Sequence, residues 1–287
     1  MADFAQQTLL VTGAGGHLGR LAVEELLARG ARNVIAGTRD ISTLADLQQK
    51  GARLRRVDFD ESDLSAAFAG VDRVLLVSTA TPDRREQQRR AVEAATAAGA
   101  QHIVYTSAPN ARPNSSVGGI ADHYWTEIAI AASGLGFTLL RNHIYAEAAL
   151  MGLDAARASG QLFDATAGKG RSYVTRADCA RTAAGALLSG EGQEIYDVSG
   201  PQAVTQEELA ALLSSLAGRT ITRVPLSGEQ LRAGLSQAGL PPFLVDLLVA
   251  FDLDAAEGHH AIVADTVEHF TSRKPQSLAD FLAAAKS

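Results

Sequence analysis

Cysteine, basic charge and long apolar runs are all scarce in this chain of 287 residues. Its one cysteine, Cys179, cannot form an internal disulfide, which fits a reducing cytoplasm best. The chain carries 26 Lys and Arg against 32 Asp and Glu, and its net charge of −6 leaves no basic stripe for nucleic-acid phosphates. The most apolar late segment, residues 243–251, is too short for a membrane span and carries Asp246. We therefore expect a cytoplasmic protein that binds neither nucleic acid nor membranes.

Metal-ligand and nucleophile patterns are also missing. The seven histidines form no helical i, i+4 pair and no Cys/His cluster with ligand spacing, so no metal site is expected. His259 and His260 are predicted to be an exposed loop pair, and Cys179 a small buried residue of an alanine-rich helix. The chain has neither a nucleophile elbow nor a phosphate loop ending in Gly-Lys-Ser.

The most informative feature that is present is the run VTGAGGHLG, residues 11–19. It follows an apolar stretch and opens a helical pattern, which is the strand–turn–helix context of a dinucleotide-binding loop. The glycines permit a tight turn, the approach of backbone N–H groups to a pyrophosphate, and close packing of helix on strand. The helix N-terminus adds free donors and a partial positive charge. The residues expected at the cofactor here are Thr12, Gly13, Gly15, Gly16, His17, Leu18 and Gly19.

The residue after the second predicted strand indicates whether the cofactor is NAD(H) or NADP(H). An NAD site places a carboxylate there for the ribose 2′-OH, whereas here Arg39 comes first, and a guanidinium suits a 2′-phosphate. The alternatives are a solvated loop arginine, or a loop shifted by one residue in which Asp40 serves the ribose. Arg39 favours NADP(H) over NAD(H).

Strand-like and helix-like segments alternate through the first half of the chain. Short connections between them indicate successive right-handed βαβ units. This order predicts an α/β fold with a doubly wound (Rossmann) parallel sheet that helices cover on both faces. The strands are expected at residues 8–12, 33–37, 53–57, 73–77, 102–106, 138–141 and 194–198.

The second half is less regular. Thr205 with Glu208 forms a capping-box pattern that starts a helix. Ser227 with Gln230 repeats this pattern, and a Pro-Pro pair at residues 241–242 suits the first turn of another helix.

We expect two structural parts. Residues 1–140 should form an NADP-binding Rossmann domain. Residues 141–287 should form a smaller, mixed α/β C-terminal substrate lobe, which also contributes late strands and helices to the Rossmann domain. The lobe should close over the carboxyl ends of the strands, where ligands bind in such folds.

Residues at the strand ends are candidates for the rest of the cofactor site. Asp58, after the third strand, can accept from the adenine amine, with the ring of Phe59 packed beside it. Small groups after the fourth and fifth strands can lie against the ribose, pyrophosphate and nicotinamide, or merely form turns at a strand end. They are Ser78, Thr79, Ala80, Thr106 and Ser107.

A proton donor is harder to identify. Short-chain dehydrogenases use a tyrosine and a lysine four residues later, whose charge lowers the phenol pKa. Tyr124 is the candidate in the right region, but Ile128 stands four residues later, so this dyad is absent. His123 and His143 flank the expected nicotinamide end. The alternatives are a packing role for Tyr124 and a structural, hydrogen-bonded role for the histidines.

Five blocks extend over nearly the whole chain: VTGAGGHLG, QQRRAVEAATAAGAQHIVYTS, ADHYWTEIAIAASG, FTLLRNHIY and VTRADCARTAAGALL. Together they resemble the NmrA-like branch of the atypical short-chain dehydrogenases, in particular its quinone oxidoreductase 2 and triphenylmethane reductase group. The resemblance implies reduction of quinones or cationic dyes without flavin or metal. It implies NADP(H) contacts at Gly13, Gly16, Gly19 and Arg39, and near Asp58, Ser78 and Tyr105–Ser107. It implies a substrate pocket near His123, Asn142, His143 and Tyr145.

One position departs from the family pattern. The family often reads His-x-x-Thr-Glu-Lys on this helix, whereas here Ile128 replaces the lysine. The replacement puts a proton relay or a ribose contact from that lysine in doubt. A quinone or a carbocationic dye, however, can take a hydride directly and collect its proton from water.

The expected function is an NADPH-dependent oxidoreductase that transfers hydride to a quinone-like or conjugated aromatic electrophile. Two alternatives stay open. One is an NADP(H)-binding redox sensor or regulator without turnover. The other is an aldehyde or ketone (aryl alcohol) dehydrogenase with Tyr124 as proton donor. The expected partners are a small aromatic or quinone substrate and, as an option, a second copy of the chain in a homodimer.

Overall fold

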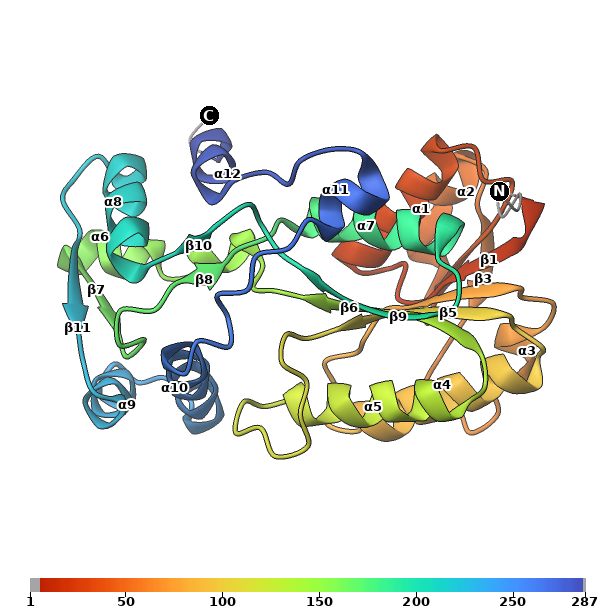
Figure 1. The fold of residues 1–287 in the computed structure, drawn as a ribbon, viewed down its shortest axis with the longest axis horizontal. Helices are drawn as coiled ribbons and strands as arrows, with labels where there is room; N and C mark the ends of the chain where they lie inside the picture. The colour runs from red at the N-terminus through yellow and green to blue at the C-terminus, as the bar shows by residue number, and fades with distance from the viewer. Residues whose placement is uncertain (1–5, 286–287) are drawn as a thin grey trace.

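A seven-stranded parallel sheet forms the centre of the computed structural model, which describes residues 6–285 (Figure 1). The strand order is β3-β2-β1-β4-β5-β6-β9, which is the order of a dinucleotide-binding sheet extended by one strand. All seven predicted strands are confirmed, with ends that differ by at most two residues. They are β1 (Thr8–Val11), β2 (Asn33–Thr38), β3 (Arg53–Arg56), β4 (Arg73–Leu76), β5 (His102–Ser107), β6 (Gly136–Asn142) and β9 (Gln193–Val198).

The central strands form because their apolar residues are buried on both faces of the sheet. Leu9, Leu10 and Val11 of β1 are fully buried, and every residue of β5 is buried. Such continuous apolar runs are typical of parallel strands that helices cover on both sides. One hydrophobic cluster fills each face of the sheet.

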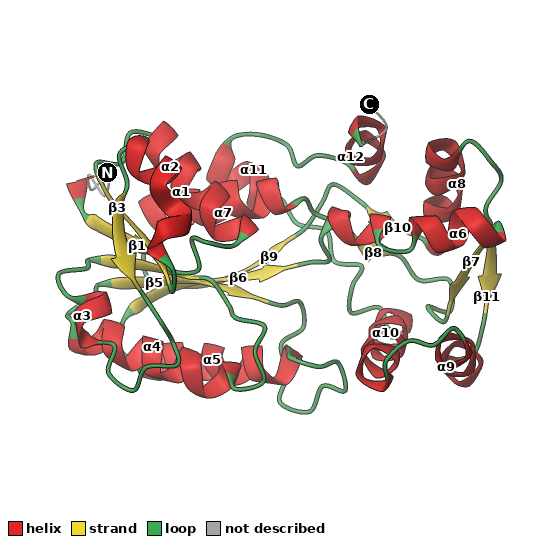
Figure 2. Ribbon diagram, turned by 180° about the vertical axis from the view of Figure 1, so that it is seen from behind, coloured by secondary structure: helices red, strands yellow, loops and turns green. Residues whose placement is uncertain are grey.

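Two helical layers cover the sheet (Figure 2). One layer holds η2 (Ile41–Leu44), α1 (His17–Ala28), α2 (Ala45–Gln49), α7 (Arg176–Ser189) and α11 (Thr266–Thr271). The other holds α3 (Ser65–Phe68), α4 (Arg84–Ala97) and α5 (Ile120–Ala132). The small residues of α7 let it pack closely, since a Cβ at Gly185 would stand 2.3 Å from the Phe270 carbonyl oxygen. Cys179 on α7 is fully buried, as predicted.

A smaller lobe lies beyond the carboxyl edge of the sheet (Figure 1). Its helices are η3 (Ala146–Leu150), α6 (Leu153–Ser159), α8 (Gln206–Ala217), α9 (Gly228–Gln237), α10 (Pro242–Ala256) and α12 (Leu278–Ala284). Its strands are β7 (Gln161–Asp164) parallel to β11 (Thr222–Pro225), and β8 (Arg171–Ser172) antiparallel to β10 (Ala203–Val204). Both predicted capping boxes are confirmed, and prolines begin α10 as predicted.

The chain passes between the two parts more than once. After the first lobe segments, α7 and β9 return to the large sheet, and α11 returns again after α10. The lobe is therefore tied to the sheet through several connections. Within residues 6–285, no helix combines the length and the apolar character that a bilayer crossing requires.

Candidate active site

The glycine loop joins β1 to α1 at the carboxyl edge of the sheet. Gly13 has a φ of +63°, a conformation that side chains disfavour, and the Ala14 N–H donates to the Gly37 carbonyl at 2.9 Å. A Cβ at Gly19 would stand 2.4 Å from the Gly13 carbonyl oxygen, and one at Gly15 would stand 2.8 Å from Thr38 Oγ1. The close packing of helix on strand that was expected from the glycines is found at Gly19 as a close approach of the helix to the loop backbone at Gly13 and Ala14.

The first turn of α1 offers its N–H groups to a ligand. Its N-cap residue is Gly16, so no side chain caps the helix, and its first turn holds no acidic residue. His17 is exposed beside this turn, whereas Leu18 is buried beneath it. Uncapped N–H groups and the positive end of a helix dipole suit an anion. This cradle, which the glycines leave open because they lack side chains, fits the pyrophosphate of a dinucleotide.

The loop after β2 contains Arg39 and Asp40, the two residues that could contact the adenosine ribose or its phosphate, and it gives them different roles. The carboxylate of Asp40 caps η2, because it accepts from the Ser42 N–H at 3.0 Å and from Ser42 Oγ at 2.6 Å. These hydrogen bonds from Ser42 hold the pKa of Asp40 below its usual value. The side chain of Arg39 is 71% exposed and reaches Asp60 at only 4.0 Å. Arg39 is thus the side chain available to an anion here, and Asp40 is committed to its own turn.

The residues after β3 are held by neighbouring arginines. Asp58 accepts from Arg56 Nη2 at 2.9 Å, and its other oxygen accepts from the Asp60 N–H at 3.2 Å. Phe59 is buried, and its carbonyl accepts from Arg90 at 2.6 Å. An adenine amine at Asp58 would therefore share a carboxylate that already has partners.

The ends of β1, β4 and β5 are linked by small hydroxyl groups. Thr12 Oγ1 accepts from the Val77 N–H at 3.0 Å and donates to the Leu75 carbonyl at 3.3 Å. Thr106 Oγ1 accepts from the Ser78 N–H at 2.9 Å and donates to Ser78 Oγ at 3.2 Å. Among the neighbouring predicted residues, Thr79 is partly buried and Ala80 is exposed. These links fix the edge that faces the lobe.

Tyr105 points into the layer between the sheet and α4 and α5. It is fully buried, and its hydroxyl lies 2.7 Å from His123 Nδ1 and 3.3 Å from Gln88 Oε1. Burial lowers the pKa of His123 to about 4, so this imidazole is neutral at pH 7. Burial likewise raises the pKa of Tyr105. The phenol is thus occupied within the protein, and a cofactor contact at Tyr105 is left to its backbone.

The exposed side of α5 carries the position of the missing lysine. Ile128 is 44% exposed and Trp125 38% exposed, whereas His123, Thr126 and Glu127 form the buried side. Tyr124 is partly buried, and its ring meets Trp125 edge-on. A lysine at position 128 would therefore lie on the outer face of the helix, and its replacement leaves the buried side unchanged.

A buried ion pair at the end of β5 was not predicted from the sequence. Ser107 Oγ donates to Glu127 Oε1 at 2.6 Å, and Glu127 accepts two further hydrogen bonds from Arg141 on β6. The available signal was a charged residue in each of two largely apolar segments, since Arg141 stands in a predicted strand and Glu127 directly before the apolar run IAIAA.

The predicted substrate residues follow β6, at the junction with the lobe. Asn142 and His143 are buried, and His143 Nε2 lies 3.1 Å from Asp197 Oδ1. The backbone of Tyr145 forms an isolated parallel β-bridge with Val174. The Arg176 guanidinium lies 4.8 Å from the centre of the Tyr145 ring. Within the described part of the chain, Asn142 Oδ1 and His143 Nδ1 are buried atoms without a hydrogen-bond partner. Buried polar atoms are normally satisfied, so these two are available to a ligand or to water.

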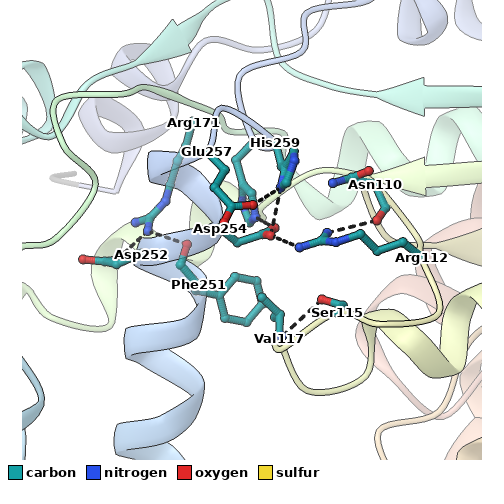
Figure 3. A network of polar contacts seen from close by, with 11 residues as sticks. Asn110, Arg112, Ser115, Val117, Arg171, Phe251, Asp252, Asp254, Glu257 and His259 are labelled. Atoms are coloured by element: carbon teal, nitrogen blue, oxygen red, sulfur yellow. Dashed lines mark hydrogen bonds and ion pairs between the residues drawn. The ribbon is translucent and has the colours of Figure 1, made fainter. Parts of the chain in front are cut away.

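Asp254 on α10 connects the lobe to the loop that follows β5 (Figure 3). Its carboxylate is 1% exposed and accepts from Arg112, from His259 Nδ1 at 2.9 Å and from His260 Nε2 at 2.8 Å. Burial alone would raise the pKa of Asp254, but the hydrogen bonds from these three side chains outweigh it and lower the pKa. The prediction that His259 and His260 form an exposed loop pair is wrong for His260. Its side chain is 1% exposed, because its hydrogen bond to the buried Asp254 holds it in the protein interior.

The same cluster brings potential metal ligands together. One ligand atom each of Asp254, Glu257 and His259 lies within 4.8 Å of the others. Arg112 and His260 already donate to the two oxygens of the Asp254 carboxylate, and the guanidinium places a positive charge beside it. The donor set therefore suits the ion pair that it forms, and we assign no metal to it.

Truncation of Asp254 is expected to destabilise the protein. Asp254→Ala leaves Arg112 and two histidines without their acceptor, and the free energy of unfolding should fall by about 3 kcal/mol in urea titrations. Asp246→Ala is the matched control on the same helix, because its pair with Arg232 is exposed and should contribute less than about 1 kcal/mol. Equal losses for the two variants would contradict the role given to Asp254.

Known proteins are similar to the chain over nearly its whole length. A family model described as NAD(P)H-binding matches residues 13–189. Quinone oxidoreductase 2 of Escherichia coli is 37% identical over 257 residues, which cover 87% of this chain and 88% of that protein. The NAD(P)H azoreductase of Xenophilus azovorans is 30% identical over 95% of this chain and 96% of that protein.

Solved structures agree with these sequence matches. The Escherichia coli NADPH-dependent quinone oxidoreductase in complex with NADPH superposes with a TM-score of 0.91 at 31% identity, covering 98% of this chain and 100% of that chain. The Citrobacter sp. triphenylmethane reductase in complex with NADP(H) gives a TM-score of 0.87 at 29% identity, covering 97% and 100%.

Proposed function

This chain belongs to the NAD(P)H-binding family, among its NmrA-like atypical short-chain reductases, and we propose that it uses NADPH to reduce quinone-like acceptors. The observation that carries the proposal is the glycine cradle at the uncapped start of α1, with Arg39 exposed and Asp40 committed to its own cap. The named activities of the similar proteins, reduction of quinones and azo compounds with NAD(P)H, give the class of acceptor.

The residues of this chain have distinct tasks in the proposed reaction. NADPH supplies the hydride when it is bound. The loop from Gly13 to Gly19 and the first turn of α1 hold the pyrophosphate, and Arg39 pairs with the 2′-phosphate. Residues at the ends of β5 and β6 position the nicotinamide half, and Asn142, His143 and Tyr145 line the acceptor side.

Hydride transfer to a quinone does not require a protein side chain that donates a proton. A quinone is electron-poor enough to take a hydride without prior protonation, and the product can collect its proton from water. His123 is neutral and hydrogen-bonded to Tyr105, and Tyr124 has no lysine four residues on. The main contribution of the protein is to hold donor and acceptor in reactive geometry.

The proposal is tested by NADPH oxidation, followed by absorbance, with a panel of quinones, azo dyes, triphenylmethane dyes and aromatic aldehydes. NADH is run in parallel. We expect turnover that prefers NADPH and favours quinones over aldehydes. Tight NADPH binding without oxidation by any acceptor would replace this proposal with a sensor. Aldehyde turnover that Tyr124→Phe abolishes would replace it with a carbonyl reductase.

Arg39 is expected to determine the preference for NADPH. Arg39→Ala should weaken NADPH binding by about 1.5 kcal/mol, roughly tenfold, because one charge-assisted contact at an exposed site is lost. NADH binding, measured by the same fluorescence titration, should stay within about twofold. Arg32→Ala, which removes an exposed arginine before the opposite end of β2, is the control. Equal losses for both dinucleotides would show that Arg39 does not contact the phosphate.

A further inference from the structure

Glu127 is a buried carboxylate that the reaction described above does not use. Its side chain is 7% exposed, on the inner face of α5. Oε1 accepts from Ser107 Oγ at 2.6 Å and from Arg141 Nε at 3.0 Å, and Oε2 accepts from Arg141 Nη2 at 2.7 Å. The two partners come from different strands, so the contacts connect α5 to the ends of β5 and β6.

Glu127 and Arg141 form a two-point ion pair, and this contact raises the pKa of Arg141. A carboxylate in an ion pair with a guanidinium can only accept hydrogen bonds. The single proton of the Ser107 hydroxyl is therefore committed to Glu127, whereas an isolated serine would rotate freely between donor and acceptor roles.

Ser107 stands where the cofactor is expected. It is the last residue of β5, it pairs with Arg141 in the sheet register, and Asn142 follows Arg141. Ligands of doubly wound folds bind at these carboxyl ends. With its proton committed, Ser107 Oγ presents only lone pairs to a ligand. The nicotinamide half of NADPH carries the matching donors, which are the carboxamide N–H and the ribose hydroxyls.

We propose that Glu127 is a positioning residue that, through Ser107, makes the end of β5 an obligatory hydrogen-bond acceptor for the nicotinamide half of NADPH. The inference rests on the proposed NADPH dependence. Glu127 itself touches neither cofactor nor acceptor in this scheme. Arg141 holds the carboxylate, the carboxylate orients the hydroxyl, and the hydroxyl oxygen meets the ligand.

The test compares two ligands that differ in the nicotinamide half. Dissociation constants for NADPH and for 2′,5′-ADP, which lacks the nicotinamide riboside and its phosphate, are measured by calorimetry for wild type, Ser107→Ala, Glu127→Gln and the double variant. Each single variant should raise the Kd of NADPH about tenfold and leave that of 2′,5′-ADP within about twofold. Because both residues act through one contact, the double variant should bind NADPH no more weakly than either single variant.

A matched control separates this role from general support of the fold. Asp164 on β7 is also a buried carboxylate held by two hydrogen bonds from one arginine, Arg223, at 2.7 and 3.1 Å. Asp164→Asn should destabilise the protein without changing the Kd of NADPH. If Glu127→Gln does not fold, Ser107→Ala alone decides, since it leaves the Glu127–Arg141 pair in place.

Three results would overturn the inference. They are an unchanged Kd of NADPH in Ser107→Ala, equal weakening of NADPH and 2′,5′-ADP in Glu127→Gln, and additive losses in the double variant. Failure of the wild-type protein to bind NADPH would instead refute the proposed function.

Discussion

Acidification from pH 7 to pH 5 is expected to lower the free energy of unfolding by about 5 kcal/mol. The cause is a set of three buried histidines that are neutral in the folded protein. Burial lowers the pKa of His102 to about 3 and those of His123 and His260 to about 4. The pKa of His260 falls in this way although its hydrogen bond to Asp254 opposes the effect of burial. In this pH range each of the three takes up its proton mainly on unfolding.

The direction follows from the proton balance. A histidine in the unfolded chain has a pKa near 6.5, above the folded values, so the unfolded state binds more protons at any pH between them. The stability from these residues is full above about pH 6.5 and decreases as the pH falls toward about 4. With three such groups the slope approaches about 4 kcal/mol per pH unit, a large part of the stability of an ordinary domain.

Urea titrations at pH 7, 6 and 5 measure this slope. Replacing one of the three histidines should remove up to about one proton from the uptake on unfolding. The slope of the free energy of unfolding against pH should then fall by up to about 1.4 kcal/mol per pH unit. His102→Asn is the suitable variant, because His102 contacts Thr138 at 3.0 Å and lies outside the proposed site. A free energy of unfolding that stays constant from pH 7 to pH 5 would show that these histidines are not buried in the neutral form.

Gly19→Ala is expected to weaken NADPH binding about a thousandfold, or by about 4 kcal/mol. The added Cβ would stand 2.4 Å from the Gly13 carbonyl oxygen, 2.7 Å from its carbon and 3.0 Å from Ala14 Cα. All three contacts are with backbone, so no side chain can rotate away. The loop must separate from α1, and the N–H groups that should converge on the pyrophosphate then lose their arrangement.

The control is a glycine with free space around it. Gly234 lies inside α9, and a Cβ there would meet no atom within 4 Å. Gly234→Ala should therefore leave NADPH binding unchanged and stabilise the helix by up to about 1 kcal/mol. Calorimetric titration of both variants with NADPH decides the point. Wild-type affinity in folded Gly19→Ala would contradict the assignment of the cradle.

Much of the fold could be predicted because its signals are local. The inner strands β1, β4 and β5 of the large sheet contain short apolar runs, and the capping boxes at Thr205 and Ser227 start α8 and α9 as expected. The glycine loop was also predictable from local sequence. Within nine residues, glycines are needed for a tight turn, for the approach of backbone N–H groups to a pyrophosphate, and for close packing of the helix.

The contacts that escaped prediction join distant positions. Arg73 on β4 is 3% exposed, and its guanidinium donates to the carbonyls of Leu187 and Gly190 at 2.7 and 2.6 Å. Nothing near Arg73 in sequence indicates that the end of α7 receives it. His260 was expected in solvent for the same reason, since its burial depends on Asp254 and on the lobe that closes around them.

In the candidate site, too, the features that depend on local sequence were predictable, and the contacts between distant residues were not. The loop, Arg39 and the strand ends follow from sequence order and from the rule that ligands bind at the carboxyl edge. The pairing of Glu127 with Ser107 and Arg141 does not, because it requires the register of β5 and β6 and the rotation of α5. The significance of Ile128 also needed the structure, which places it on the exposed side of that helix.

We expect this chain to transfer hydride directly from NADPH to a quinone-like acceptor. The most direct test of this claim is a single turnover, in which flavin-free protein with bound NADPH is mixed anaerobically with a benzoquinone. Absorbance should show that all bound NADPH is oxidised as an equal amount of quinone is consumed. Deuterium at one of the two C4 positions of NADPH should slow the step, and deuterium at the other should not. Bound NADPH that stays reduced, or that is oxidised only after flavin is added, would contradict the claim.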